Sequence, residues 1–146
     1  MANHEHFIRR CLELAASARE QGNTPVGSVV VLGDTIIGEG IETLPAGPSI
    51  TGHAEMLACQ SALDATGLPD LAGAILYTTA EPCFMCGYVA RQLRFSLVVH
   101  GKDTPIIGAV TSIHPILTDP ALNDWRPAPK VISGILREEC ERLKKK

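Results

Sequence analysis

The sequence predicts an α/β protein in which a β-sheet lies between helices. Segments with apolar residues at helical spacing alternate along the chain with short β-branched runs that are typical of strands. Two of the predicted helices are each followed by a buried strand, and such crossovers place parallel strands side by side in a sheet. The chain has 146 residues, 45% of them hydrophobic, so we expect one domain over residues 1–146.

The first predicted elements are a helix and a β-hairpin. Apolar residues recur at helical spacing over residues 7–18, and Gly22 follows as a stop signal. Residues 26–32 are rich in valine and predict a strand, and residues 35–38 predict its returning partner after a Gly-Asp turn. Residues 43–52 contain two prolines and two glycines, so we expect a loop here that forms one wall of a pocket.

The rest of the chain continues the alternation of helices and strands. The residues from His53 onward add three helices and three strands, predicted as a helix from His53, a strand over 74–79, a helix from Pro82, strands over 95–99 and 130–132, and a helix over 134–143. No internal repeat or low-complexity segment interrupts this order.

Four residues in two short motifs predict a catalytic zinc site. His53 and Glu55 form a His-x-Glu motif, and Cys83 and Cys86 form a Pro-Cys-x-x-Cys motif after Pro82. Catalytic zinc sites take three protein ligands and keep the fourth position for water, whose pKa falls to about 7. His53, Cys83 and Cys86 supply three ligands, and Glu55 is the candidate catalytic residue that carries protons.

The expected helices make this set geometrically plausible. Cys83 and Cys86 are at i and i+3, one face of a helix, and Pro82 suits the first helical position because it lacks an N–H. The helix dipole at this end lowers thiol pKa values, so we expect two thiolates. His53 and Glu55 point in nearly opposite directions on a regular helix, so they serve one site only if it lies over the helix end.

Either motif alone is weak evidence. Cys-x-x-Cys also occurs in redox motifs and structural metal sites, and His-x-Glu occurs by chance. A redox motif would not explain His53 and Glu55, so their combination with the cysteines favours the zinc site.

The other three of the five cysteines, Cys11, Cys59 and Cys140, fall in helix-like segments. They predict small buried side chains of a protein in a reducing cytoplasm.

Composition points to a small substrate. The formal net charge is −3, whereas a broad nucleic-acid surface requires clustered Lys and Arg, so we expect no nucleic-acid partner. No apolar run approaches the roughly 20 residues of a membrane span, and the N-terminus lacks the core of a signal peptide. We therefore expect a cytoplasmic protein with no membrane contact.

These motifs and several flanking segments resemble the cytidine deaminase superfamily, in the branch of cytosine deaminase, guanine deaminase and tRNA adenosine deaminase. The resemblance covers nearly the whole chain and includes Pro25-Val26-Gly27, Gly38-Glu39-Gly40, Thr79-Ala80-Glu81-Pro82-Cys83, Gly134-Ile135-Leu136 and Glu139-Cys140. It implies a three-layer α/β/α sandwich with a five-stranded mixed sheet, one Zn²⁺ per subunit and a homodimer. It also implies that Glu55 moves protons from water to a ring nitrogen and to the departing amine.

Glu42 departs from the pattern of that family. Alignment on Gly38-Glu39-Gly40 and His53 places Glu42 where the family has an asparagine. An amide donates and accepts hydrogen bonds, whereas an ionised carboxylate only accepts. Glu42 thus favours a substrate with an N–H or amino group at this edge, such as isocytosine, a guanine-like purine, a pterin or an aminotriazine such as ammeline, over cytosine. Alternatively, Glu42 lies solvated on the rim, or the loop shifts the register.

Further candidate substrate-binding residues surround the motifs. Aromatic and polar side chains that could contact a planar ring are Phe84, His114 and Trp125, and two motif neighbours, Ala54 and Glu81, complete the set. Each aromatic residue also suits a core or interface. We expect deamination of a nucleobase-like small heterocycle with release of ammonia; the alternatives are editing of adenosine in tRNA and a non-enzymatic, zinc-stabilised interaction module.

Overall fold

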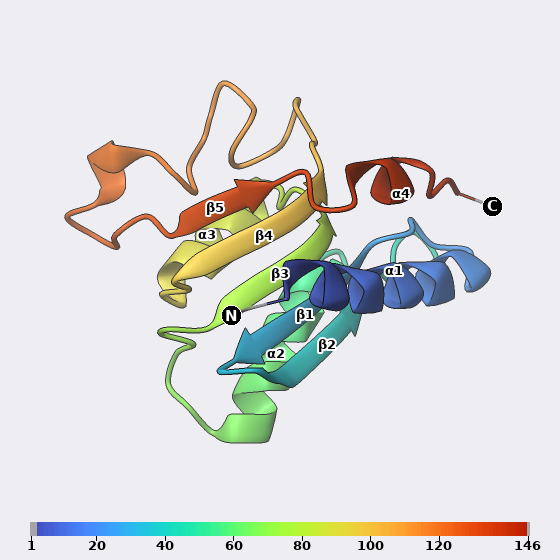
Figure 1. Ribbon diagram of the computed structural model, residues 1–146, viewed down its shortest axis with the longest axis horizontal. Helices are drawn as coiled ribbons and strands as arrows, with labels where there is room; N and C mark the ends of the chain where they lie inside the picture. Colours follow the sequence, from blue (N-terminus) through green and yellow to red (C-terminus); the bar gives the residue numbers. More distant parts are fainter. Residues whose placement is uncertain (1–2, 146) are drawn as a thin grey trace.

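A computed structural model describes residues 3–145 of the chain. Along the chain, helices and strands alternate as expected (Figure 1), in the order α1 (His4–Glu20), β1 (Gly27–Leu32), β2 (Thr35–Ile41), α2 (Ala54–Thr66), β3 (Ile75–Ala80), α3 (Phe84–Gln92), β4 (Leu97–Lys102), a 3-10 turn η1 (Pro120–Leu122), β5 (Lys130–Ser133) and α4 (Arg137–Glu141). Among these described residues, no helix is both long and apolar enough to cross a membrane.

The strands form one mixed sheet of five strands. Their spatial order is β2-β1-β3-β4-β5. β1 runs antiparallel to both β2 and β3, whereas β3, β4 and β5 are parallel. The parallel pair β3 and β4 is joined through α3, as the predicted crossover requires. The expected five-stranded mixed sheet is confirmed.

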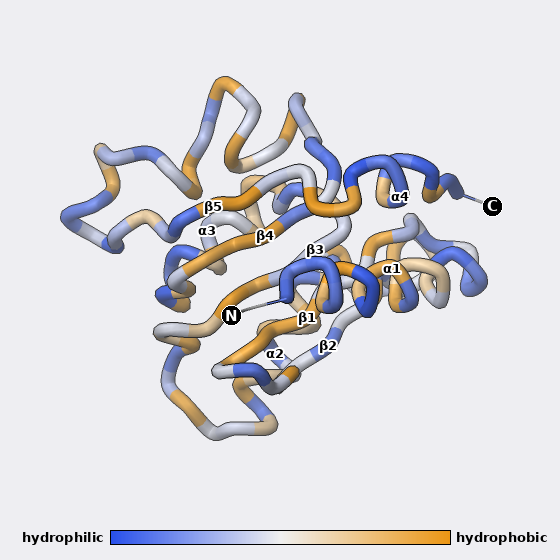
Figure 2. Tube along the Cα trace, in the orientation of Figure 1, coloured by the Kyte–Doolittle hydropathy of each residue, from blue (hydrophilic) through white to orange (hydrophobic). Residues whose placement is uncertain are grey.

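Helices cover both faces of this sheet, so the expected three layers are also confirmed. α1 and α4 lie on one face and α2 and α3 on the other (Figure 1). Side chains alternate between the two faces along each strand. Val29 and Tyr77 pack with Phe7 of α1, whereas Val30 and Leu76 pack toward α2 and α3. Figure 2 shows the resulting apolar colour along the central strands.

Two glycines of β2 bring α2 unusually close to the sheet. A Cβ atom at Gly38 would lie 2.6 Å from the backbone nitrogen of Ala62, and one at Gly40 would lie 2.6 Å from that of Ala58. Only glycine permits this approach of helix and strand backbones. The contact brings the start of α2 beside the end of β2, where His53 and Glu42 are found.

Two predicted helix starts differ from the structure. Pro82 precedes the N-cap residue Cys83 instead of occupying the first helical position, because Cys83 is extended (ψ 179°) and forms a β-bridge with Gly108. The final helix is shorter than residues 134–143. Left-handed backbone at Gly134 (φ 83°) and Leu136 (φ 53°) delays its start until Arg137.

Candidate active site

The three predicted metal ligands converge at the N-terminal ends of two helices. His53 is the N-cap residue of α2, Cys83 is the N-cap residue of α3, and Cys86 lies in the first turn of α3. The Nδ1 atom of His53 lies 3.5 Å from Sγ of Cys83 and 3.6 Å from Sγ of Cys86. Neither His53 nor Cys83 makes a side-chain capping hydrogen bond, and the two side chains face each other across the shared site.

These distances fit a tetrahedral zinc ion. Zn–N bonds of about 2.0 Å and Zn–S bonds of about 2.3 Å at tetrahedral angles imply N···S separations of about 3.5 Å. One imidazole and two thiols also form a donor set that binds zinc in preference to magnesium or calcium. When bound, zinc supplies a Lewis acid that makes water nucleophilic near neutral pH.

The two sulfur atoms differ in their affinity for protons. The hydrogen bond from Cys86 is the main cause that lowers the pKa of Cys83 to about 5. The same bond, together with burial, raises the pKa of Cys86. The expectation of two thiolates therefore holds for Cys83 but not for Cys86, which would have to lose its proton to serve as a zinc ligand.

Glu55 is buried beside the candidate metal ligands. It lies in the first turn of α2 and is 6% exposed. Burial, which penalises the charged carboxylate, raises the pKa of Glu55 to about 7. A carboxyl group in this range can both accept and release a proton near neutral pH. His53 and Glu55 share one site because it lies over the helix end, as expected.

A cavity of about 370 Å³ opens over these residues. Five of the ten predicted site residues line it, together with several that the sequence did not indicate. Its lining is Thr24, Val26, Glu42, Leu44, His53, Glu55, Ala80, Glu81, Cys83, Lys102, Thr104 and Ile107. Of the missed residues, Lys102 is the last residue of β4 and Thr104 lies just beyond it. Ligands of open α/β sheets bind at these strand ends, so this position was the available signal.

Glu42 lies inside the cavity and not on a solvated rim. It is 7% exposed, and its Oε1 atom accepts a hydrogen bond of 3.4 Å from the backbone N–H of Ala54. Burial raises the pKa of Glu42, while the nearby His53 acts in the opposite direction. Ala54 itself is fully buried and does not line the cavity; it contributes its N–H to the orientation of Glu42.

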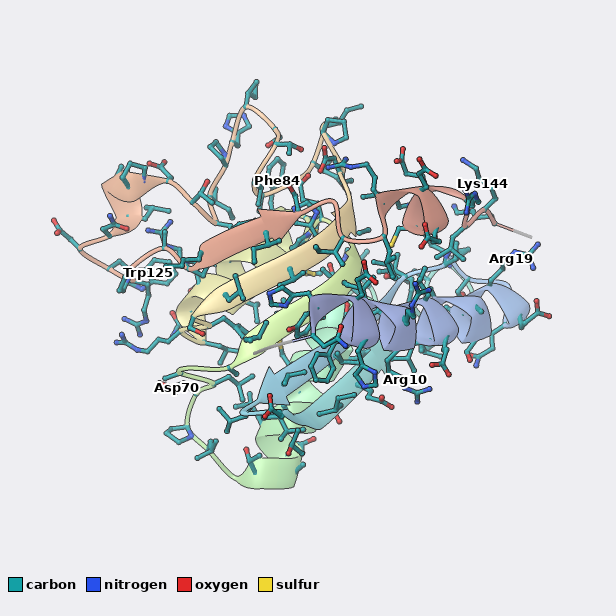
Figure 3. The ribbon with its side chains drawn as sticks, viewed as in Figure 1. Arg10, Arg19, Asp70, Phe84, Trp125 and Lys144 are labelled. Atoms are coloured by element: carbon teal, nitrogen blue, oxygen red, sulfur yellow. The ribbon has the colours of Figure 1, made fainter. Side chains whose placement is uncertain are left out.

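The predicted aromatic residues lie outside this cavity. Phe84 and His114 contact each other edge to face, with ring centroids 5.9 Å apart. Trp125 stacks on Tyr88 at 5.2 Å. Figure 3 shows Trp125 at the outer end of the long loop between β4 and β5, well apart from Phe84. The structure thus does not bring these three rings together with the candidate ligands.

A second group of potential metal ligands is formed by Glu81, His100 and Asp103, and most of its polar atoms have partners within the protein. The Glu81 carboxylate accepts hydrogen bonds from the following loop, and Asp103 pairs with Arg137 at 3.0 Å. Nδ1 of His100 lies 3.2 Å from the carbonyl oxygen of Lys102, and burial lowers the pKa of His100. Protein donors therefore hold the two carboxylates, whereas Nε2 of His100 is buried without a hydrogen-bond partner.

A three-ligand His/Cys/Cys centre and a buried glutamate over a mixed five-stranded sheet define a zinc-dependent hydrolytic deaminase. The comparison with protein families agrees with this class. Residues 1–102 match the cytidine and deoxycytidylate deaminase zinc-binding region. The chain belongs to the cytidine deaminase superfamily.

Individual relatives cover most of this chain. A tRNA-specific adenosine deaminase of Bacillus subtilis is 33% identical over 140 residues, which are 96% of this chain and 85% of the relative. A solved structure from work on A-to-I editing by tRNA:A34 deaminases at the wobble position of transfer RNA superposes with a TM-score of 0.88 at 32% identity, covering 95% of this chain and 99% of that one. A diaminohydroxyphosphoribosylaminopyrimidine deaminase/reductase of Thermotoga maritima has a TM-score of 0.71 at 32% identity; the match covers 96% of this chain and 38% of the other.

Proposed function

We propose that this protein deaminates an adenosine of tRNA to inosine. The observation that carries the proposal is similarity to a tRNA-specific adenosine deaminase over 96% of this chain and 85% of that relative, together with the His/Cys/Cys centre beside the cavity. This reverses the expectation, based on net charge, that nucleic acid is not a partner. Net charge describes the whole chain, whereas access of one base requires only local contacts, to which Lys102 in the cavity lining contributes.

The roles of the residues follow from their positions. His53, Cys83 and Cys86 would hold zinc, and Glu55 would take a proton from the attacking water and deliver it to the ring nitrogen beside the amino-bearing carbon. Once the water oxygen has added to that carbon, Glu55 would take the remaining proton of the new hydroxyl group and deliver it to the departing amine. The exocyclic C–N bond then breaks, and ammonia and a ring carbonyl result. A group with a pKa near the working pH is suited to both transfers.

The direct test is inosine formation in a tRNA transcript with adenosine at the wobble position. We expect zinc-loaded protein to convert this adenosine and release one ammonia per inosine, and a transcript with guanosine there to remain unchanged. Binding should weaken as salt rises, because phosphate contacts release counterions. The absence of inosine, with ammonia released from free heterocycles by the same preparation, would contradict the proposal.

Glu42 favours a second candidate function, deamination of a free heterocycle. When it is ionised, the buried Glu42 side chain can accept hydrogen bonds but cannot donate them. It therefore suits a ring that presents an N–H or amino group. Isocytosine, guanine-like purines, pterins and ammeline have such an edge, whereas cytosine presents a carbonyl oxygen. A polar group left unpaired in a closed site is costly, which permits large discrimination between such substrates.

The substitution Glu42→Asn tests the second candidate function. We expect the wild type to prefer isocytosine to cytosine, and Glu42→Asn to reduce this ratio of kcat/KM values at least tenfold, because its amide N–H can donate to the cytosine carbonyl. The measurement is ammonia release from each base, with Glu138→Gln as an exposed control. An unchanged preference would remove the argument from Glu42.

A further inference from the structure

The Glu81 carboxylate is completely occupied by hydrogen bonds from one loop. Its Oε1 atom accepts from the backbone N–H of Thr104 at 2.9 Å and from the hydroxyl of Thr111 at 2.6 Å. Its Oε2 atom accepts from the backbone N–H groups of Val110 and Thr111, both at 2.8 Å. A carboxylate offers about four acceptor positions, so these bonds leave none for a substrate.

The four bonds close a short loop that forms part of the cavity wall. Thr104 and Val110 flank residues 105–109, so a single carboxylate holds both ends of this segment. Within it, Ile107 lines the cavity and is 48% exposed. Since the wall is made by a loop and not by a helix or strand, its position depends on these anchors.

The same loop is also attached to the metal-binding segment. The backbone N–H of Ala109 donates to the carbonyl oxygen of Pro82 at 2.8 Å, and Gly108 forms a β-bridge with Cys83. A Cβ atom at Gly108 would overlap the Glu81 carboxylate, which shows how closely the loop is packed onto it. Glu81 therefore fixes the loop relative to a candidate zinc ligand two residues further along the chain.

We propose that Glu81 is a positioning residue for substrate selection, which acts through residues 104–111 by holding Ile107 as a wall of the active-site cavity. This assignment replaces the sequence-based prediction that Glu81 binds substrate. The assignment of Glu81 rests on one part of the proposed function, namely that deamination takes place in this cavity. Discrimination at this wall is steric, and distinct from the polar recognition assigned to Glu42.

The first test needs no substrate. Hydrogen exchange of the Thr104, Val110 and Thr111 amides is compared between the wild type and Glu81→Gln, whose side chain carries two acceptor positions and two N–H donors in place of four acceptors. We expect at least tenfold faster exchange at these three amides and unchanged exchange in β1 and β3. Thr111→Val removes one of the four bonds and keeps the carboxylate, so it should show a smaller effect of the same kind. Unchanged exchange in both variants would overturn the proposal.

The second test separates positioning from general damage to the fold. Its substrate is whichever of four compounds the zinc-loaded wild type deaminates fastest: the wobble-adenosine tRNA transcript, isocytosine, guanine or ammeline. We expect Glu81→Gln to raise KM at least tenfold while kcat falls less than threefold and zinc content stays at one per chain. Thr111→Val should raise KM less, and Glu138→Gln, which changes an exposed carboxylate, should leave both constants unaltered.

A double-mutant cycle with Ile107→Ala tests whether Glu81 acts through the wall. If it does, Glu81→Gln changes KM less than threefold in the Ile107→Ala background. Fully additive effects, or a loss confined to kcat, would overturn the proposal. If the fastest substrate is a free base, the proposed tRNA function fails while this cycle still decides the role of Glu81.

Discussion

Three carboxylates line one cavity, and their surroundings separate their roles. Glu55 is buried over the helix end with a raised pKa, which suits proton transfer. Glu42 retains acceptor capacity inside the cavity beyond the long bond from Ala54. The Glu81 carboxylate accepts four hydrogen bonds from the loop over residues 104–111, which suits a structural role. We therefore expect the same functional group to serve chemistry at Glu55, recognition at Glu42 and support at Glu81, according to what surrounds it.

Glu55→Gln tests the chemical role at the level of a single residue. The amide keeps the size of the side chain but cannot exchange the protons of the reaction, so we expect kcat/KM to fall by roughly 10²- to 10⁴-fold. Zinc content should remain one per chain, because the ligand atoms of His53, Cys83 and Cys86 are unchanged. Ammonia release and metal analysis on the same preparation give the result. Near-normal turnover would show that another group carries the protons.

At the level of elements, polar contacts join the helices to the loops and strands around them. Arg91 of α3 is 1% exposed and donates to the carbonyl oxygens of Ile116 and Arg126, both at 2.8 Å, and to Asn123 at 2.9 Å. This side chain holds the long β4–β5 loop on the helix that carries Cys86. Arg10 of α1 makes a two-point contact with Glu39 of β2, at 2.7 and 2.9 Å.

The contact between α1 and β2 predicts a pH dependence of stability. Hydrogen bonding to Arg10 lowers the pKa of Glu39 below its ordinary value of 4.5. The contribution of this carboxylate is therefore present above pH 4.5 and is lost as pH falls through the lower pKa of the folded state. Because both side chains are about one third exposed, we expect only about 0.5 kcal/mol. The difference in unfolding free energy between the wild type and Glu39→Gln should shrink from pH 6 to pH 3. A constant difference would contradict this origin.

For the molecule as a whole, the candidate metal site joins α2 to α3. Both helices are on the same face of the sheet, and the ligands come from their N-terminal ends. A metal that binds only the folded state stabilises it in proportion to the logarithm of its free concentration. The homodimer expected from the family resemblance stays a prediction, which a measured molecular mass in solution would test.

Removal of zinc should therefore affect both stability and activity. We expect a chelator to abolish ammonia release and to lower the thermal midpoint by several degrees, and equimolar zinc to restore both. The control is His53→Ala, in which the chelator should change the midpoint little, because one of the three ligands is already absent. Full activity after complete removal of metal would contradict a zinc-dependent reaction.

Much of the fold was predictable because its signals are local. The valine-rich run of β1, the Gly33-Asp34 turn and the helical spacing of α1 each follow from short-range preferences. Helix starts were less predictable. Pro82 lies two residues before the first residue of α3, because Cys83 pairs with Gly108. Gly108 is 25 residues beyond Cys83, and a local pattern contains no information about such a partner.

The candidate site, like the fold, was predictable from the sequence only in part. The spacing of His53, Glu55, Cys83 and Cys86 determined the donor set and hence the class of reaction, because ligand chemistry depends on residue type. Only the tertiary structure decided which other residues reach the cavity. It placed Glu42, Lys102 and Ile107 on the cavity wall and left Phe84, His114 and Trp125 outside the cavity. It also showed that the Glu81 carboxylate accepts its hydrogen bonds from the loop over residues 104–111. Those outcomes depend on contacts between segments far apart in the sequence, which residue type alone does not specify.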